Sequence, residues 1–289
     1  MRRIYFVTTQ HLEDALWFRD EDDFRVAMNY VAIESARRPE VVVLAFVLMS
    51  NHVHFVLKGG EEDVTMFVNE FKRRYSVYFQ SKYKSHALLR RNGMRVSEIP
   101  YNDEAVEKVI AYTLMNPVAA NICAFCNQYS WGTGNLFFNL AKADGVPIRT
   151  LSARGRERLF HTNSSIVPAD WLVSPEGYIL PQNYVDVEAV ERIFRTPQRF
   201  GYFLRSSSKA QRRMEADENL PAFRDQTILS ALPDLCRSLF QKDSFGELST
   251  KDQAEFARQI KFRFSADAHQ IARVCGITYA AAAELLESV

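Results

Sequence analysis

The residues best suited to chemistry are two histidines in a run of apolar residues from Leu48 to Leu57. His52 and His54 are separated by one valine, and alternate residues of a strand point to the same face of a sheet. Two imidazoles on one face supply half of the ligand set of a divalent metal. The alternative is a histidine pair that only packs within a sheet. Because two of the six histidines fall together in this run, we favour the metal site.

A tyrosine and an asparagine form the second candidate pair. Tyr112 and Asn116 are four residues apart in a segment with a helical pattern, so they share a helix face. A tyrosine can act as a covalent nucleophile, and the oxygen of an asparagine amide can bind a hard metal ion. Taken alone this pair carries little weight, because the chain has 12 tyrosines and most tyrosines are packing residues with a polar tip.

A block of positive charge lies between the two pairs. From Phe71 to Arg95 the chain has eight basic residues and no acidic one, whereas the whole chain has a formal net charge of only +1. A local basic block in a neutral protein indicates a surface that binds a polyanion. The candidate DNA-binding residues in this block are Lys72, Arg73, Arg74, Lys82, Lys84, Arg90 and Arg91.

Aromatic residues are interleaved with these charges over the segment 70–84, which is predicted to be helical. Aromatic rings stack on bases and basic heads follow phosphates, which suits single-stranded DNA. The alternative is an amphipathic helix with an aromatic core stripe and a solvated charged face. We expect the stripe of Phe71, Tyr75, Tyr78 and Phe79 to be mainly core, and the charged face to bind DNA and to border the cavity of the two histidines.

The candidate residues need a framework, and the apolar pattern predicts one within the first 120 residues. Strands are expected at 3–9, 41–49, 52–58 and 94–99, and helices at 22–36, 63–84 and 103–115. Two strands joined by a tight turn, with a helix on either side in the sequence, favour an α+β fold over a doubly wound parallel sheet. We therefore predict an antiparallel sheet with flanking helices.

Two phrases of this segment resemble a known family. Met49-Ser50-Asn51-His52-Val53-His54 is similar to the "MPNHVH" segment of single-tyrosine HUH transposases of the insertion-sequence type. The stretch from Ala111 to Ala120 is similar to the "RYIHLNPVRA" segment of their REP-associated branch, and Tyr129-Ser130-Trp131-Gly132 to its "YPWSS" close. The phrases have the family's order and separation, and the resemblance covers about residues 1–140.

The resemblance implies a fold and a reaction. The fold is the ferredoxin-like, RRM-like sheet of HUH transposases. His52, His54 and Asn116 match the ligands of Mg²⁺ or Mn²⁺, and Tyr112 matches the nucleophile that attacks a phosphodiester of single-stranded DNA. The products are a 5′-phosphotyrosine and a free 3′-hydroxyl. The implied partner is single-stranded or hairpin DNA, and family members occur as monomers or homodimers.

The chain departs from the family pattern at three positions: Ser50 replaces a proline, Leu114 a histidine and Ala119 a basic residue. None of the proposed chemical residues is missing. One alternative is a domesticated DNA-binding protein that keeps the transposase fold with little or no cleavage activity. Another is an HUH nuclease of the replication-initiator type, although those often carry two tyrosines and a helicase partner.

Beyond about residue 140 the chain no longer alternates between strand and helix patterns. We predict a catalytic domain at 1–140, an irregular α-rich connecting region at 141–215 with a linker at 206–209, and a helical bundle at 216–289. The segment 268–288 has a helix-turn-helix pattern with Gly276 in its turn. Its second helix carries mostly alanine, leucine and glutamate, so we expect little reading of duplex sequence.

Composition sets the remaining limits. With 47% hydrophobic and 25% charged residues in 289, the chain is ordinary globular material. Four cysteines are too few for a disulfide framework, and no apolar run approaches the roughly 18 residues of a membrane-spanning helix. The first residues lack the pattern of a signal peptide. We therefore expect a cytoplasmic protein with no membrane partner.

Overall fold

The computed structural model describes residues 3–9, 16–84, 93–100, 102–120, 122–141, 144–161, 166–217, 225–264, 266 and 268–287. The first part of the chain runs through β1 (Arg3–Thr9), α1 (Glu21–Arg37), β2 (Val42–Met49), β3 (His52–Gly59), α2 (Glu61–Tyr83), β4 (Met94–Glu98) and α4 (Asp103–Ala119). This is the predicted order of elements. The four strands form one antiparallel sheet in the order β2-β3-β1-β4, so the predicted α+β fold is confirmed.

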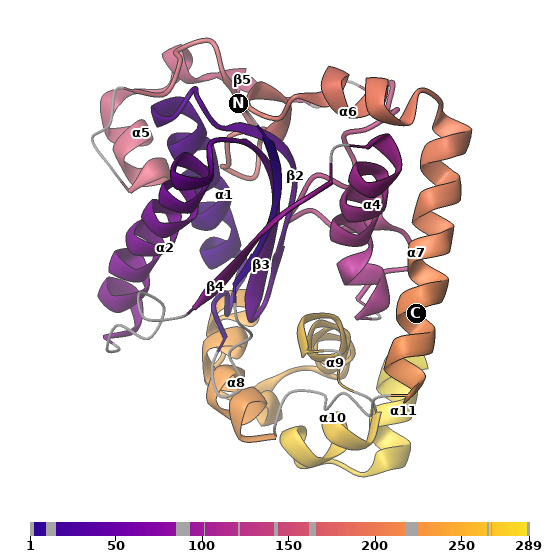
Figure 1. Cartoon of the computed structure of the whole chain (residues 1–289). Coiled ribbons are helices and arrows are strands. Elements are labelled where there is room, and N and C mark those ends of the chain that lie inside the picture. Colours follow the sequence, from indigo (N-terminus) through magenta and orange to yellow (C-terminus); the bar gives the residue numbers. More distant parts are fainter. Residues whose placement is uncertain are drawn as a thin grey trace.

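The helices cover the two faces of this sheet unequally (Figure 1). The helices α1 and α2 pack together on one face, and α4 packs on the other face against β2 and β3. Strand β1 shows the difference, because Tyr5 and Val7 are buried under α1 and α2 whereas Phe6 and Thr8 on the opposite face are only partly buried. The sheet therefore has one fully covered face and one face that α4 covers in part.

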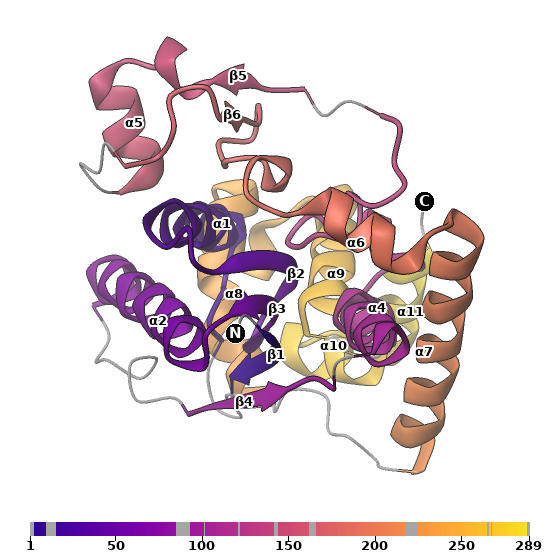
Figure 2. The ribbon, with the colours of Figure 1, turned by 45° about the horizontal axis from the view of Figure 1, so that its top comes forward.

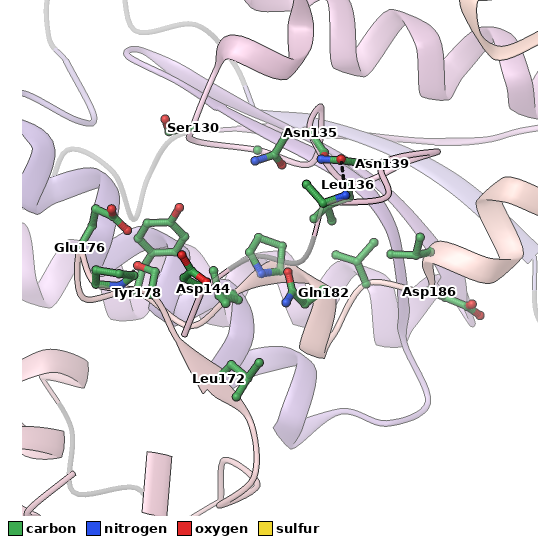
Figure 3. Close-up of a pocket in the computed structure, with 18 of the residues that line it drawn as sticks. Ser130, Asn135, Leu136, Asn139, Asp144, Leu172, Glu176, Tyr178, Gln182 and Asp186 are labelled. Carbon is green, nitrogen blue, oxygen red and sulfur yellow. Dashed lines mark hydrogen bonds between the residues drawn. The ribbon is translucent and has the colours of Figure 1, made fainter. Parts of the chain in front are cut away.

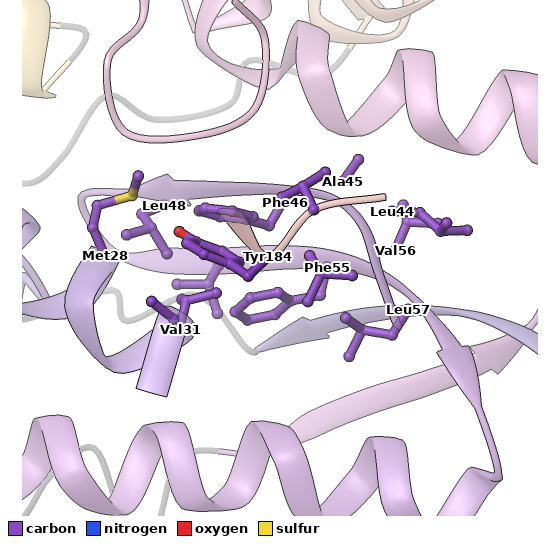
Figure 4. Close-up of a cluster of buried hydrophobic side chains, with 14 of the residues drawn as sticks. Met28, Val31, Leu44, Ala45, Phe46, Leu48, Phe55, Val56, Leu57 and Tyr184 are labelled. Carbon is purple, nitrogen blue, oxygen red and sulfur yellow. The ribbon is translucent and has the colours of Figure 1, made fainter. Parts of the chain in front are cut away.

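The core under α1 and α2 is rich in aromatic rings (Figure 4). Phe46 of β2 and Phe55 of β3 are direct cross-strand partners, and their ring centroids lie 5.9 Å apart. Phe55 also meets Phe67 and Phe71 of α2 edge to face. Because Phe46, Phe55, Phe67 and Phe71 are fully buried, each contributes roughly 2–3 kcal/mol of apolar burial to the stability of this layer.

Residues beyond 130 complete the outer edge of β2. Trp131 and Thr133 exchange backbone hydrogen bonds with Leu48 and Phe46, and Val185 forms a parallel bridge with Val43. The connecting segments are a small hairpin of β5 (Val146–Pro147) and β6 (Leu172–Val173), then α5 (Ala153–Phe160), α6 (Val187–Phe194) and α7 (Pro197–Asp217). Segments far apart in the sequence thus protect an edge that would otherwise be open.

The helix α7 lies along α4 and holds it in place. Arg199 of α7 forms a bidentate ion pair with Glu107 of α4, whose side chain is fully buried. The predicted linker at 206–209 is wrong, because these residues continue α7 without a break. Three consecutive serines have the composition of a linker, but the apolar residues before them fix the helix against α4 and it continues through the serines.

The C-terminal helices gather at the end of the sheet that carries the β2–β3 turn (Figures 1 and 2). They are α8 (Asp225–Phe240), α9 (Thr250–Phe264), α10 (Ala268–Cys275) and α11 (Tyr279–Glu287). They share a separate hydrophobic cluster into which Leu16 inserts from the N-terminal part. A positive φ of 67° at Gly276 turns the chain between α10 and α11. In the described part of the chain, no helix is long and apolar enough to cross a membrane.

An ion network with two buried carboxylates joins α1 to α2. Asp20 caps α1 by accepting a hydrogen bond from the Asp23 backbone, and Lys82 of α2 donates to both carboxylates at 2.6–2.8 Å. Burial, together with the nearby charge of Asp20, raises the pKa of Asp23 to about 6 despite the opposing effect of Lys82. Lys82 is therefore the cation that makes the burial of two neighbouring carboxylates tolerable.

Replacing Lys82 by methionine is expected to lower the free energy of unfolding by roughly 2–3 kcal/mol, because it leaves two partly uncompensated carboxylates. The ionised form of Asp23 is disfavoured in the folded protein, so this group favours folding below pH 4 and loses that contribution as the pH rises through 6. The variant raises the pKa of Asp23 further. Its stability deficit is therefore expected to be larger at pH 8 than at pH 5 in urea unfolding.

The matched control is Lys108→Met, since Lys108 is paired with Glu104 on the exposed surface of α4. Exposed pairs of this kind stabilise a protein by about 0–1 kcal/mol, so the control is expected to change little at either pH. Equal deficits for the two variants would contradict the role of Lys82 as the internal counterion.

Candidate active site

The two histidines of the sequence motif lie on one face of β3. The Nε2 atoms of His52 and His54 are 2.9 Å apart, and the ring planes are nearly perpendicular with centroids 4.6 Å apart. Both side chains are buried, with exposed fractions of 6% and 3%. The alternation of β3 places Val53 between them on the opposite face, where it is part of the hydrophobic core.

The β2–β3 turn fixes the orientation of His52. The Nδ1 atom of His52 donates to the side-chain oxygen of Asn51 at 2.7 Å, which leaves the Nε2 lone pair directed toward His54. The preceding residue, Ser50, is buried and donates its hydroxyl to the backbone oxygen of Arg263 in α9 at 2.7 Å. The C-terminal helices therefore contact the turn immediately before the histidine pair.

Tyr112 lies beside the histidine pair. Its ring centroid is 5.8 Å from that of His54, and the two rings meet edge to face. Phe6 of β1 completes the cluster, because its ring stacks on His54 at 5.5 Å and meets the edge of Tyr112 at 5.7 Å. With 38% of its surface exposed, Tyr112 is accessible to a ligand from solvent, unlike the imidazoles.

Asn116 follows Tyr112 by one helical turn and is largely buried. Its Nδ2 donates to the backbone oxygen of Tyr112 at 2.9 Å, so the amide is tied to α4 through its nitrogen. The predicted end of this helix at 115 is too early, because α4 runs through Pro117 to Ala119. Proline leaves the Thr113 carbonyl without its helical donor, and Asn116 Nδ2 lies 3.5 Å from that carbonyl.

The spacing of the two imidazole nitrogens suits a small divalent ion. In an octahedral site with metal–ligand distances of about 2.1 Å, two adjacent ligand atoms are about 3.0 Å apart. The Nε2 atoms of His52 and His54 are 2.9 Å apart, which is the length of the hydrogen bond between the two rings and is also close to this value. Among the described residues there is no group of three or more His, Cys, Asp or Glu that could hold a metal. A site at this histidine pair would therefore need an amide oxygen or a ligand oxygen to complete it.

The basic helix does not border this cluster, so that prediction is wrong. It is α2, which packs on the opposite face of the sheet from α4. Lys72 is only 4% exposed, Arg74 pairs with the buried Glu34, and Lys82 pairs with Asp20 and Asp23. The buried carboxylates Glu34, Asp20 and Asp23 require Arg74 and Lys82 as partners, which the local sequence of α2 cannot show.

The other members of the predicted DNA-binding set differ in their surroundings. Arg73 is half-exposed and pairs with Glu70 within α2. Lys84 is exposed at the C-terminal end of α2. Arg90 and Arg91 lie outside the described residues.

The tyrosines of α2 are unsuited to nucleophilic attack. Burial is the main cause that raises the pKa of Tyr75, Tyr78 and Tyr83 above the ordinary value, and the nearby charge of Asp23 adds to it. Tyr78 and Tyr83 donate hydrogen bonds to Asp23, and Tyr75 donates to the backbone oxygen of Trp17. These hydroxyl groups are committed to holding α2 against the N-terminus of α1, so Tyr112 has no competitor among them.

A large polar cavity lies elsewhere (Figure 3). Its volume is about 940 Å³, and it lies between the segment 130–144 and the segment 172–188. Four carboxylates line it, from Asp144, Glu176, Asp186 and Glu188, and the described lining residues include no lysine, arginine or histidine. The negative charge of this cavity would repel a nucleic acid. We therefore do not assign the cavity to the same function as the histidine and tyrosine cluster.

Three residues of the site were not found from the sequence. Phe6 stacks on His54, Asn51 orients His52, and Arg263 anchors the β2–β3 turn through its backbone. The adjacency of Asn51 to the first histidine was a usable signal. The roles of Phe6 and Arg263 depend on strand pairing and on the docking of distant helices, which no local pattern reveals.

Comparisons with known proteins agree with the motif. Residues 15–94 match the family described as "Transposase IS200 like". A solved structure of a REP-associated tyrosine transposase bound to a REP hairpin matches 46% of this chain and 77% of its own chain, with 13% sequence identity and a TM-score of 0.38. No curated protein matches the chain. The segment that carries both histidines is therefore similar to the IS200-like transposases, which confirms the resemblance found in the sequence for residues 15–94.

Proposed function

We propose that this protein is a transposase-type enzyme that cleaves and rejoins single-stranded or hairpin DNA through Tyr112. The observation that carries the proposal is the position of the exposed Tyr112 ring against a buried histidine pair whose Nε2 atoms lie 2.9 Å apart. The match of residues 15–94 to IS200-like transposases supports it. That match ends before Tyr112, so the nucleophile rests on the geometry and on the motif around it.

In the proposed reaction the Tyr112 oxygen attacks a backbone phosphorus atom. A bond forms between the phenolic oxygen and phosphorus, the bond from phosphorus to the 3′ oxygen breaks, and the strand upstream leaves with a 3′-hydroxyl. The phenol loses its proton to solvent, and the 3′ oxygen that leaves takes up a proton from solvent. The phosphotyrosine ester replaces one phosphodiester bond by another, so the step is reversible and needs no nucleotide cofactor.

His52, His54 and Asn116 are the proposed ligands of Mg²⁺ or Mn²⁺. When bound, the ion would polarise the scissile phosphate and favour in-line attack. The hydrogen bond from His52 Nδ1 to Asn51 holds one imidazole with Nε2 directed inward, an arrangement typical of metal-binding histidines. Because two imidazoles and an amide are weak ligands for Mg²⁺, phosphate oxygens are expected to complete the shell.

A DNA-binding protein that no longer cuts is the alternative function. The observation that favours it is that Leu114 and Ala119, on the same helix as Tyr112, stand where the family motif has a histidine and a basic residue. Formation of a covalent adduct distinguishes the two functions, since only the enzyme forms it.

Replacing Tyr112 by phenylalanine is expected to abolish the covalent adduct and to leave the fold and DNA binding unchanged, because the ring and its contacts with His54 and Phe6 are kept and only the hydroxyl is lost. The measurement is a denaturing gel with a hairpin oligonucleotide that carries a single-stranded extension, labelled at either end. The shifted protein band should carry only the fragment downstream of the cut.

The matched control is Tyr202→Phe, which removes the hydroxyl of another exposed tyrosine, on α7. The control is expected to form adduct at the wild-type rate. A Tyr112→Phe protein that still forms the band would show that another residue is the nucleophile.

The metal proposal predicts that a chelator stops cleavage and that Mn²⁺ restores it at least as well as Mg²⁺, because imidazole ligands suit Mn²⁺ better. His54→Ala is expected to remove both adduct formation and the binding of Mn²⁺ observed by electron paramagnetic resonance in the presence of DNA. His269→Ala, which changes an exposed histidine on α10, is the control and should retain both. Cleavage that persists in excess chelator would exclude a metal-dependent reaction.

A further inference from the structure

We infer that Arg95 of β4 binds a backbone phosphate of the DNA strand next to the phosphate that Tyr112 attacks. This inference rests on the proposed function and names a contact that positions its substrate. Arg95 belongs to the basic block of the sequence, yet it lies on a different element from the cations of α2. Its position follows from the register of the sheet.

Strand pairing places Arg95 on the face of the histidine pair. Thr8 of β1 is the direct partner of His54 on one side and of Arg95 on the other. Directly opposed residues of antiparallel strands point to the same face, so His54, Thr8 and Arg95 form one row across the sheet. Adjacent strands lie about 4.8 Å apart, which puts the backbone of Arg95 roughly 10 Å from that of His54.

Among the described elements, no helix is packed over the β1 and β4 half of this face. The helix α4 packs on β2 and β3, whereas β1 and β4 extend beyond it toward the free edge of the sheet (Figure 2). Phe6, Thr8 and Ser97 are partly buried on this surface, and Arg95 is exposed. Tyr112 stands at the border between the covered and the open halves, because its ring contacts both His54 and Phe6.

The charge of Arg95 is available on this surface. Within the described part of the chain, no ion pair or hydrogen bond engages its guanidinium, in contrast to Arg74 and Lys82 of the same block. The neighbours that share its face, Phe6, Thr8 and Ser97, carry no charge. The guanidinium of an arginine presents a planar fork of hydrogen-bond donors that matches a phosphate. Because it is the charged group on an otherwise uncharged surface, this surface favours an anionic ligand.

A single strand is the form of DNA that fits. A strand that crosses β4 and β1 toward Tyr112 meets Arg95 first and then Phe6. These contacts lie within a few nucleotides of the scissile phosphate. Phosphate contacts fix the register of a strand without reading its sequence. Arg95 would therefore hold the strand so that the scissile phosphate meets the tyrosine and the histidine pair, and is a positioning residue rather than a catalytic one.

The test compares Arg95→Gln with the wild type in the full chain, using fluorescence anisotropy of a hairpin oligonucleotide with a single-stranded extension at several salt concentrations. The variant is expected to bind about tenfold more weakly, as for loss of one charge-assisted hydrogen-bond pair. Its slope of log affinity against log salt should become shallower by about 0.7, as for one lost phosphate contact on a single strand. Arg95→Lys should keep the slope.

Lys58→Gln is the matched control, because Lys58 is exposed on the same strand as His54 and four residues away, roughly 13 Å along β3. It is expected to keep the wild-type affinity and slope. An Arg95→Gln protein with wild-type affinity and slope would overturn the inference, and so would an equal loss in the Lys58 variant. Unchanged melting temperatures of the variants exclude misfolding as the cause.

Adduct formation by the wild type tests the proposed function separately. If the wild type shows the salt slope that depends on Arg95 but forms no adduct, cleavage is contradicted and the phosphate contact stands. If the wild type forms the adduct and Arg95→Gln binds and reacts equally well, only the phosphate contact is contradicted.

Discussion

The register of β3 is the constraint on which the site depends. Every second residue of this strand, including His52 and His54, faces α4, while Val53 and Phe55 face α1 and α2. A slip of one residue would move both imidazoles into an aromatic core and bring apolar side chains to the site. The buried aromatic layer penalises such a slip, so the packing on one face of the sheet holds the chemical groups on the other.

The division of the sheet into two faces also explains the basic block. Glu34, Asp20 and Asp23 are buried at the α1 interface, and each needs a cation from α2. A charge pattern along one helix cannot distinguish a lysine that faces solvent from one that neutralises a distant carboxylate. The same block contains Arg95, whose surroundings are set by strand pairing and lack any carboxylate on its row. Residues of one sequence block thus have different surroundings on the two faces.

The sequence was sufficient for features that depend on local periodicity. The strands, the helices of the first 120 residues and the shared face of the two histidines follow from patterns of two and of 3.6 residues. The end of α4 was placed too early because Asn116 supports the helix across Pro117, and the linker at 206–209 was wrong because α7 is held by Glu107, which is 92 positions away from Arg199. Contacts at such separations leave no local signal, and neither do Phe6 and Arg263 in the site.

The C-terminal helices occupy a place that ties the fold to the chemistry. They contact the N-terminal part through Leu16 and through the hydrogen bond from Ser50 to Arg263, at the turn that precedes His52. The family pattern has proline where this chain has Ser50, and a proline could not donate that hydrogen bond. Serine at this position therefore allows a hydrogen bond to α9, a helix that lies outside the family motif. The hydrogen bond from Ser50 to Arg263 thus fixes the backbone immediately before His52 from outside the sheet, so the docking of α9 bears directly on the position of the histidine pair.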